Sequence, residues 1–134
     1  GRWTLTRKII QRNGDVFAFM GEAEFSWLEG SEQEESRELS YYENGEVTAP
    51  NGHVMPAERR YFWQQLQTGL FEVLFDDKRY FHSFSATNPN AEHLCGDDNY
   101  VVRYDFSTWP VWRSTWKVIG PRKDYTMISK YSPA

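Results

Sequence analysis

The feature that most constrains this chain is an alternation of apolar and polar side chains that continues through most of its length. Between residues 17 and 27, apolar or small side chains occupy every second position, and the pattern returns in residues 100–106 and 112–118. A period of two is the signature of a β-strand, because successive side chains point to opposite faces. The sequence therefore predicts an all-β protein.

Turn-forming pairs divide the alternating runs into about ten strands. These pairs include Asn13-Gly14, Asn44-Gly45, Asn51-Gly52 and Gly120-Pro121. The expected strands lie near residues 2–11, 15–28, 37–43, 46–49, 57–67, 69–76, 79–85, 91–95, 99–107 and 111–131, the last broken at Gly120-Pro121. So high a strand content is unusual for an ordinary domain but typical of a barrel. We predict one domain, residues 1–134, folded as a single closed antiparallel β-barrel of the lipocalin and fatty-acid-binding-protein type.

Composition narrows the function classes. The net charge of −4 argues against a general nucleic-acid binder, and no apolar run is long enough to cross a membrane. The first twelve residues lack the apolar core of a signal peptide, and a single Cys excludes a disulfide framework. We therefore expect a cytoplasmic or other reducing compartment, with neither nucleic acid nor membrane as a partner.

The same alternation places polar side chains on the ring-bearing face of several strands. For example, Arg7 shares a face with Trp3 and Leu5, and Tyr80, His82 and Phe84 share another. If that face lines the lumen, the polar groups inside are Arg7, Glu43, Arg59, Tyr61, His82, His93, Tyr104, Lys123 and Tyr125.

Two interpretations of this polar lumen stay open. An excess of cations favours a small-molecule binding barrel for an anionic ligand, a carboxylate or phosphate held by Arg7, Arg59 and Lys123. Alternatively, the charges form an internal network in which Arg7 or Arg59 pairs with Glu43 and only stabilises the fold.

The histidines allow an enzyme as a further hypothesis. His82 or His93, with Tyr125, would act as acid or base in a non-oxidative lyase or isomerase reaction. His82, His93 and Cys95 could alternatively hold zinc, or one histidine could hold haem, but the spacing matches no specific metal motif and we expect no cofactor. A structural subunit with exposed aromatic side chains is the third hypothesis.

The acidic segment 29–38 has no apolar stripe. Like charges repel one another, so we interpret it as a solvated loop, with a lid over the barrel mouth as the alternative.

Two resemblances support the barrel. Gly1-Arg2-Trp3 resembles the Gly-x-Trp that opens lipocalin-type (calycin) barrels, where the Trp closes one end. Over nearly the whole chain the sequence also resembles an uncharacterised family whose function is unknown, most strongly in Tyr104-Asp105-Phe106-Ser107-Thr108-Trp109-Pro110 and Gly120-Pro121-Arg122-Lys123-Asp124-Tyr125. The resemblance implies a barrel fold and assigns no reaction.

Overall fold

The computed structural model describes residues 1–27, 37–66, 70–85, 88–95 and 97–134. These residues form ten strands: β1 (Arg2–Gln11), β2 (Val16–Trp27), β3 (Arg37–Thr48), β4 (Val54–Gln65), β5 (Leu70–Phe75), β6 (Tyr80–Ser85), β7 (Asn90–Cys95), β8 (Asp98–Asp105), β9 (Trp112–Ile119) and β10 (Asp124–Pro133). The predicted all-β class is confirmed, and the total of ten strands agrees, although residues 37–49 were expected to form two strands and residues 111–131 a single broken one. The described residues contain no helix that could cross a membrane.

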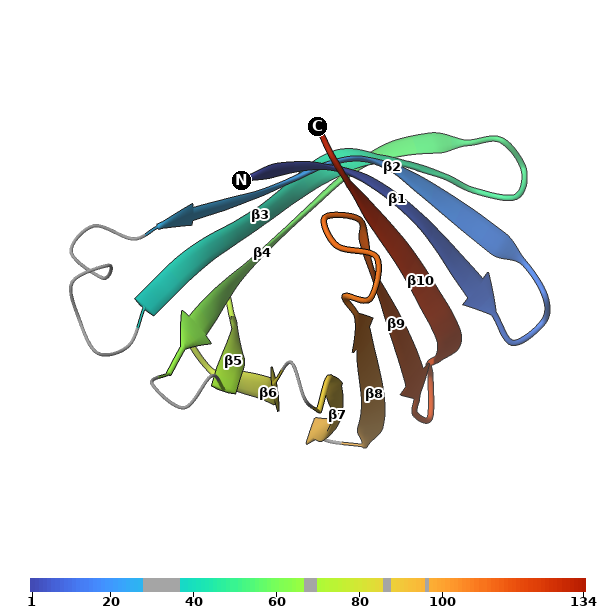
Figure 1. The fold of residues 1–134 in the computed structure, drawn as a ribbon. Helices are drawn as coiled ribbons and strands as arrows, with labels where there is room; N and C mark the ends of the chain where they lie inside the picture. The colour runs from blue at the N-terminus through green and yellow to red at the C-terminus, as the bar shows by residue number, and fades with distance from the viewer. Residues whose placement is uncertain (28–36, 67–69, 86–87, 96) are drawn as a thin grey trace.

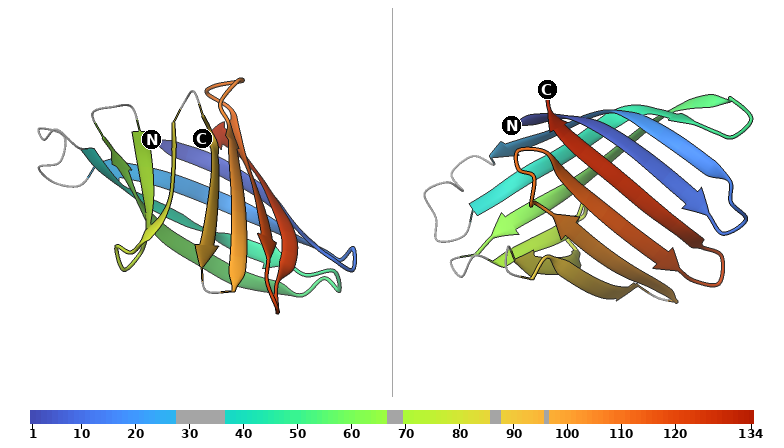
Figure 2. Two further views of the ribbon diagram at one scale, coloured as in Figure 1. Left: turned by 90° about the horizontal axis from the view of Figure 1, so that it is seen from below. Right: turned by 45° about the vertical axis from the view of Figure 1, so that its right-hand side comes forward.

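The strands form one antiparallel sheet in the order β6-β5-β4-β3-β2-β1-β10-β9-β8-β7, which curls into a barrel (Figures 1 and 2). Pairing of β1 with β10 joins the two ends of the chain. The barrel is not fully closed, because β6 and β7 are the two edges of the sheet. Ser85 and Asn88 exchange two backbone hydrogen bonds at the start of the connection, and the described residues form no ladder beyond them.

The inner face of the sheet holds the core, as the alternation predicts. In β9, for instance, Trp112, Ser114, Trp116 and Val118 are buried while the residues between them are more exposed. The buried apolar side chains form one cluster inside the barrel that includes Leu5, Phe19, Tyr41, Val73, Phe81, Tyr104, Met127 and Tyr131. The diameter of a barrel grows with its number of strands, so many aromatic rings are needed to fill the lumen of a ten-stranded barrel.

The predicted turn at Asn44-Gly45 is wrong, because both residues lie inside β3. Gly45 pairs with Gly21 of β2. A Cβ atom built on Gly21 would lie 2.7 Å from the Gly45 Cα and 2.1 Å from the Asn44 carbonyl oxygen. The glycine at position 45 therefore allows two strands to approach closely rather than ending one of them.

A β-bulge corrects the predicted face of Tyr80. The register shifts after Val73, so that Val73 pairs with His82 while Leu74 pairs with Tyr80. Phe81 is left between these pairs, and both Phe81 and His82 are buried. As a result His82 and Phe84 face the lumen as predicted, but Tyr80 faces outward and is 51 % exposed.

Candidate functional site

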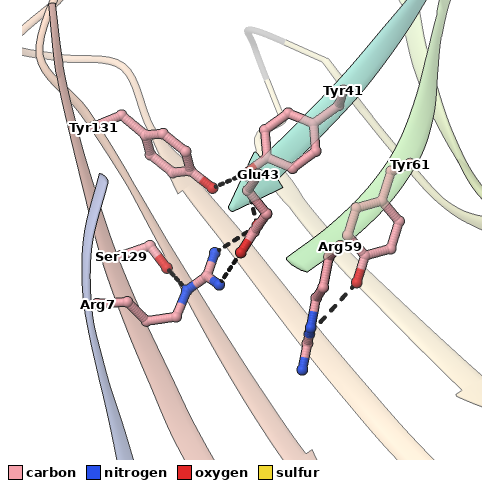
Figure 3. A network of polar contacts seen from close by, with 7 residues as sticks. All are labelled: Arg7, Tyr41, Glu43, Arg59, Tyr61, Ser129 and Tyr131. Atoms are coloured by element: carbon pink, nitrogen blue, oxygen red, sulfur yellow. Dashed lines mark hydrogen bonds and ion pairs between the residues drawn. The ribbon is translucent and has the colours of Figure 1, made fainter. Parts of the chain in front are cut away.

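A network of buried polar groups crosses the middle of the barrel (Figure 3). The Arg7 guanidinium donates from Nη1 to Glu43 Oε2 at 2.5 Å and from Nη2 to Glu43 Oε1 at 3.0 Å. Its Nε donates to Ser129 Oγ at 2.7 Å. The Tyr41 hydroxyl donates to Glu43 Oε1 at 2.8 Å and lies 2.8 Å from the Tyr131 hydroxyl. Each guanidinium nitrogen and both groups of the ion pair therefore have partners inside the protein.

The strand pairing explains how these residues meet. Arg7 of β1 lies directly opposite Ser129 of β10, and Tyr131 follows two positions later on the same face. Glu43 of β3, which is separated from β1 only by β2, reaches Arg7 on the inner face, and both side chains are almost fully buried. Burial raises the pKa of Tyr131 to about 12, so its hydroxyl stays neutral beside the ion pair.

This geometry matches the structural-network interpretation for Arg7. A buried carboxylate with a bidentate arginine and a phenol has little capacity left for a ligand. Ser129, Tyr41 and Tyr131 were not predicted as site residues, although alternation places Ser129 and Tyr131 on the inner face of the last strand.

Arg59 differs from Arg7 in its surroundings. Its guanidinium points away from the Arg7–Glu43 pair (Figure 3), and its side chain is open to solvent. Nη1 lies 3.5 Å from the Tyr61 hydroxyl. Within the described part of the chain, Arg59 forms no ion pair. Of the three cations predicted to bind an anion, it is the one that forms no ion pair with a described carboxylate.

Lys123 does not lie in the lumen as predicted. It precedes β10, its side chain is 45 % exposed, and its Nζ lies 3.1 Å from Asp98 Oδ2 and 3.4 Å from the Tyr100 hydroxyl. Lys123 lies in the turn that follows Gly120-Pro121, outside the strand. The alternation of side chains along β10 therefore does not determine which way it faces. Tyr125, inside β10, is half-buried on the inner face.

The two predicted histidines lie near each other, but their surroundings differ. His82 is 1 % exposed, and its Nε2 lies 2.9 Å from the Tyr104 hydroxyl, whereas Nδ1 has no hydrogen-bond partner among the described residues. Burial, and secondly the nearby His93, lower the pKa of His82 to about 3. The imidazole is therefore neutral near pH 7 and poorly suited to donate a proton there. His93 is half-buried, with its ring 5.6 Å from that of Phe81.

The polar residues enclose little free space. A cavity of about 20 Å³ is lined by the network together with Arg59, Tyr61 and Tyr104. That volume holds about one water molecule. Among the described residues no three His, Cys, Asp or Glu side chains lie close enough to hold a metal ion. The Cys95 side chain and residues 29–36 of the acidic segment lie outside the described residues, so the zinc and lid alternatives stay predictions.

A larger pocket opens at the end of the barrel where β1 begins and β2 ends, and we call it the aromatic cup. It has a volume of about 640 Å³. Its lining residues are Gly1, Trp3, Phe25, Trp27, Leu39, Trp63, Phe71, Phe84, Phe106, Trp109 and Trp112. In Figure 2 (left), the N-terminus and the orange loop before β9 lie at this same end.

The cup has a buried floor and an exposed rim. Trp63, Phe84 and Trp112 are buried at the floor, whereas Trp27 and Trp109 at the rim are 49 % and 61 % exposed. The Trp3 ring contacts those of Trp109 at 5.3 Å and Trp112 at 6.1 Å. The sequence signal for the cup was the placement of rings at the starts of odd-numbered strands and the ends of even-numbered ones. Those positions converge at one end of an antiparallel barrel.

Comparison with known proteins identifies one family. Residues 1–133 match the family model DUF6314, described as a family of unknown function. No curated protein and no solved structure matches the chain.

Proposed function

Because the chain belongs to DUF6314, a family of unknown function, its activity has to be inferred from its own site, and we propose that it binds a small, mainly apolar, ring-containing molecule in the aromatic cup. The observation that carries this proposal is an open pocket of about 640 Å³ that is lined almost entirely by aromatic side chains. Ligand pockets typically have volumes of roughly 300–1,000 Å³ and a mainly apolar lining.

The surroundings of the cup support binding rather than simple packing. Rings such as Trp109 gain hydrophobic stabilisation when water is removed from them, at about 25 cal/mol per Å² of apolar area. The wall rings also meet one another edge to face, as Phe25 does with Trp63 at 5.0 Å and 83°. A flat ring entering the cup would find both ring faces and ring edges available for contact. The aromatic lining is therefore the reason for proposing an apolar, ring-containing ligand.

A neutral fluorescent probe tests the proposal. We expect N-phenyl-1-naphthylamine to bind saturably, with enhanced probe emission and a change in tryptophan fluorescence, since five tryptophans line the cup. Trp109→Ala removes a rim ring and should weaken binding about tenfold, the equivalent of roughly 1.4 kcal/mol. Tyr80→Ala is the matched control, because Tyr80 is a comparably exposed ring outside the cup lining. Equal loss in both variants, or no saturable binding, would contradict the proposal.

An anionic ligand remains a second candidate, now centred on Arg59. It is favoured by one observation: this guanidinium is exposed, lines the polar cavity, and forms no ion pair with any described residue. We expect inorganic phosphate to shift the NMR signals of residues around Arg59, and Arg59→Ala to abolish those shifts. Arg60→Ala is the control, because Arg60 is the next residue and faces outward beside Ser40. Identical shifts in wild type and Arg59→Ala would exclude this site. The lyase or isomerase and subunit hypotheses stay predictions.

A further inference from the structure

The outward-facing charges of the barrel are segregated by sign. The outer faces of β8, β9, β10 and β1 carry six cations, at Arg2, Lys8, Arg103, Arg113, Lys117 and Lys130. The outer faces of β2, β3, β4 and β5 carry six carboxylates, at Glu22, Glu24, Glu38, Glu46, Glu58 and Glu72. Three described residues of these strands are exceptions: Asp105 and Asp124 lie on the basic side and Arg60 on the acidic side. The net charge of −4 therefore hides two faces of opposite sign.

Each face contains a surface hollow of matching sign. One hollow of about 780 Å³ extends from β9 to β3, and its lining includes the cations Lys8, Arg113 and Lys130 as well as Glu46. A second hollow of about 590 Å³ is lined by Glu22, Glu46 and Glu58. Because Glu46 lines both, the two hollows are adjacent.

The outward-facing charges that line the two hollows form no ion pair within the described part of the molecule. These charges include Lys8, Lys130, Glu22 and Glu46. Between the two signs lies Met20, which is 67 % exposed, and Ile128 on the basic side is 42 % exposed. An exposed apolar patch bordered by unpaired charges of both signs is the composition expected of an interface.

We propose that this surface is a dimer interface and that its partner is a second copy of this chain. Strand pairing places Lys130, Thr6, Met20 and Glu46 in one row across β10, β1, β2 and β3. A two-fold axis along the strands, between β1 and β2, would set β1 of one copy against β2 of the other and β10 against β3. Lys130 of each copy then faces Glu46 of its partner, and Thr6 faces the partner's Met20.

In the two-fold arrangement each contact of the row occurs twice, once on either side of the axis, which is the property of an isologous interface. A second copy also explains why both signs occur side by side on one surface, since an acidic or a basic partner would use only one of them. Exposed ion pairs contribute little individually and are screened by salt. The dimer is therefore weak, sensitive to salt, and separate from the aromatic cup at the strand ends.

Sedimentation velocity of the full chain tests this interface. We expect a concentration-dependent dimer at about 0.05 M salt that dissociates at about 0.5 M, where the Debye length falls below about 5 Å. Lys130→Glu and Glu46→Lys should each raise the dimer dissociation constant at least tenfold, because like charges then face each other twice. Lys117→Glu is the charge-matched control outside the row, and it should change that constant less than twofold.

Mixing the two variants gives the decisive result. In a mixed dimer the carboxylate introduced at position 130 of one chain would face the ammonium group introduced at position 46 of the other. The remaining native pair would be kept, so dimerisation should return to the wild-type level. The double variant Lys130→Glu/Glu46→Lys should dimerise for the same reason. A wild-type chain that sediments as a monomer at every concentration and salt would overturn the proposal. So would variants that weaken the dimer individually but fail to restore it when mixed.

Discussion

The polar network and the aromatic cup lie on either side of the stacked rings of Trp112 and Tyr131, whose centroids are 3.7 Å apart, and they differ in how completely the protein fills them. In the network, Arg7 and Glu43 satisfy each other and leave a cavity of about 20 Å³. In the cup, rings surround about 640 Å³ of open space. Charges buried without partners would be costly, so the polar half has to be complete in the folded chain. Apolar rings can stay partly exposed to water at a modest cost in free energy, so the cup can remain open in the folded chain without a ligand.

The largest expected effect comes from breaking the network. Glu43→Gln leaves the Arg7 charge buried without a carboxylate, which should lower the free energy of unfolding by about 3–5 kcal/mol. Arg7→Met/Glu43→Leu removes both charges and should recover most of that loss. Urea denaturation measures both variants. A loss below about 1 kcal/mol in Glu43→Gln would mean that the network is not structural.

Acid should destabilise the protein through His82. The unfolded chain protonates this imidazole near pH 6.5, whereas the folded chain does so only near pH 3. The folded pKa is depressed, so the stability contributed by neutral His82 is present above pH 6.5 and is lost as the pH falls towards 3. The expected slope is about 1.4 kcal/mol per pH unit. Between pH 6.5 and 4.5, urea denaturation of His82→Gln should show a shallower dependence. An unchanged slope would contradict this assignment.

Arg59→Ala should have a much smaller effect on stability than any change at Arg7. Its guanidinium is open to solvent and forms no ion pair with a described residue, so we expect a change in unfolding free energy within about 1 kcal/mol. Thermal denaturation beside Arg60→Ala provides the comparison. If Arg59→Ala instead unfolded the protein, Arg59 would belong to the structural network.

The contrast also shows what the sequence could predict. Period two placed Arg7 and Glu43 on inner faces, because a strand's alternation fixes its faces without further information. It misplaced Tyr80, since the bulge at Phe81 puts Tyr80 on the face opposite to that of His82 and Phe84. The cup could not be located as a pocket, because its rings come from strands far apart in the chain. The alternative of Arg7 paired with Glu43 was foreseen, but only the register across β1, β2 and β3 shows how they meet.

The indole N–H signals of the protein test the central claim, which is that the aromatic cup binds a ligand whereas the polar network stabilises the fold. Five of the six tryptophans line the cup, and Trp116 lines the polar cavity instead. In a ¹H–¹⁵N correlation spectrum titrated with N-phenyl-1-naphthylamine, we expect saturable shifts for Trp3, Trp109 and other cup indoles, with Trp116 unchanged. Shifts centred on Trp116 while the cup signals stay fixed would place the ligand among the polar groups and contradict this account.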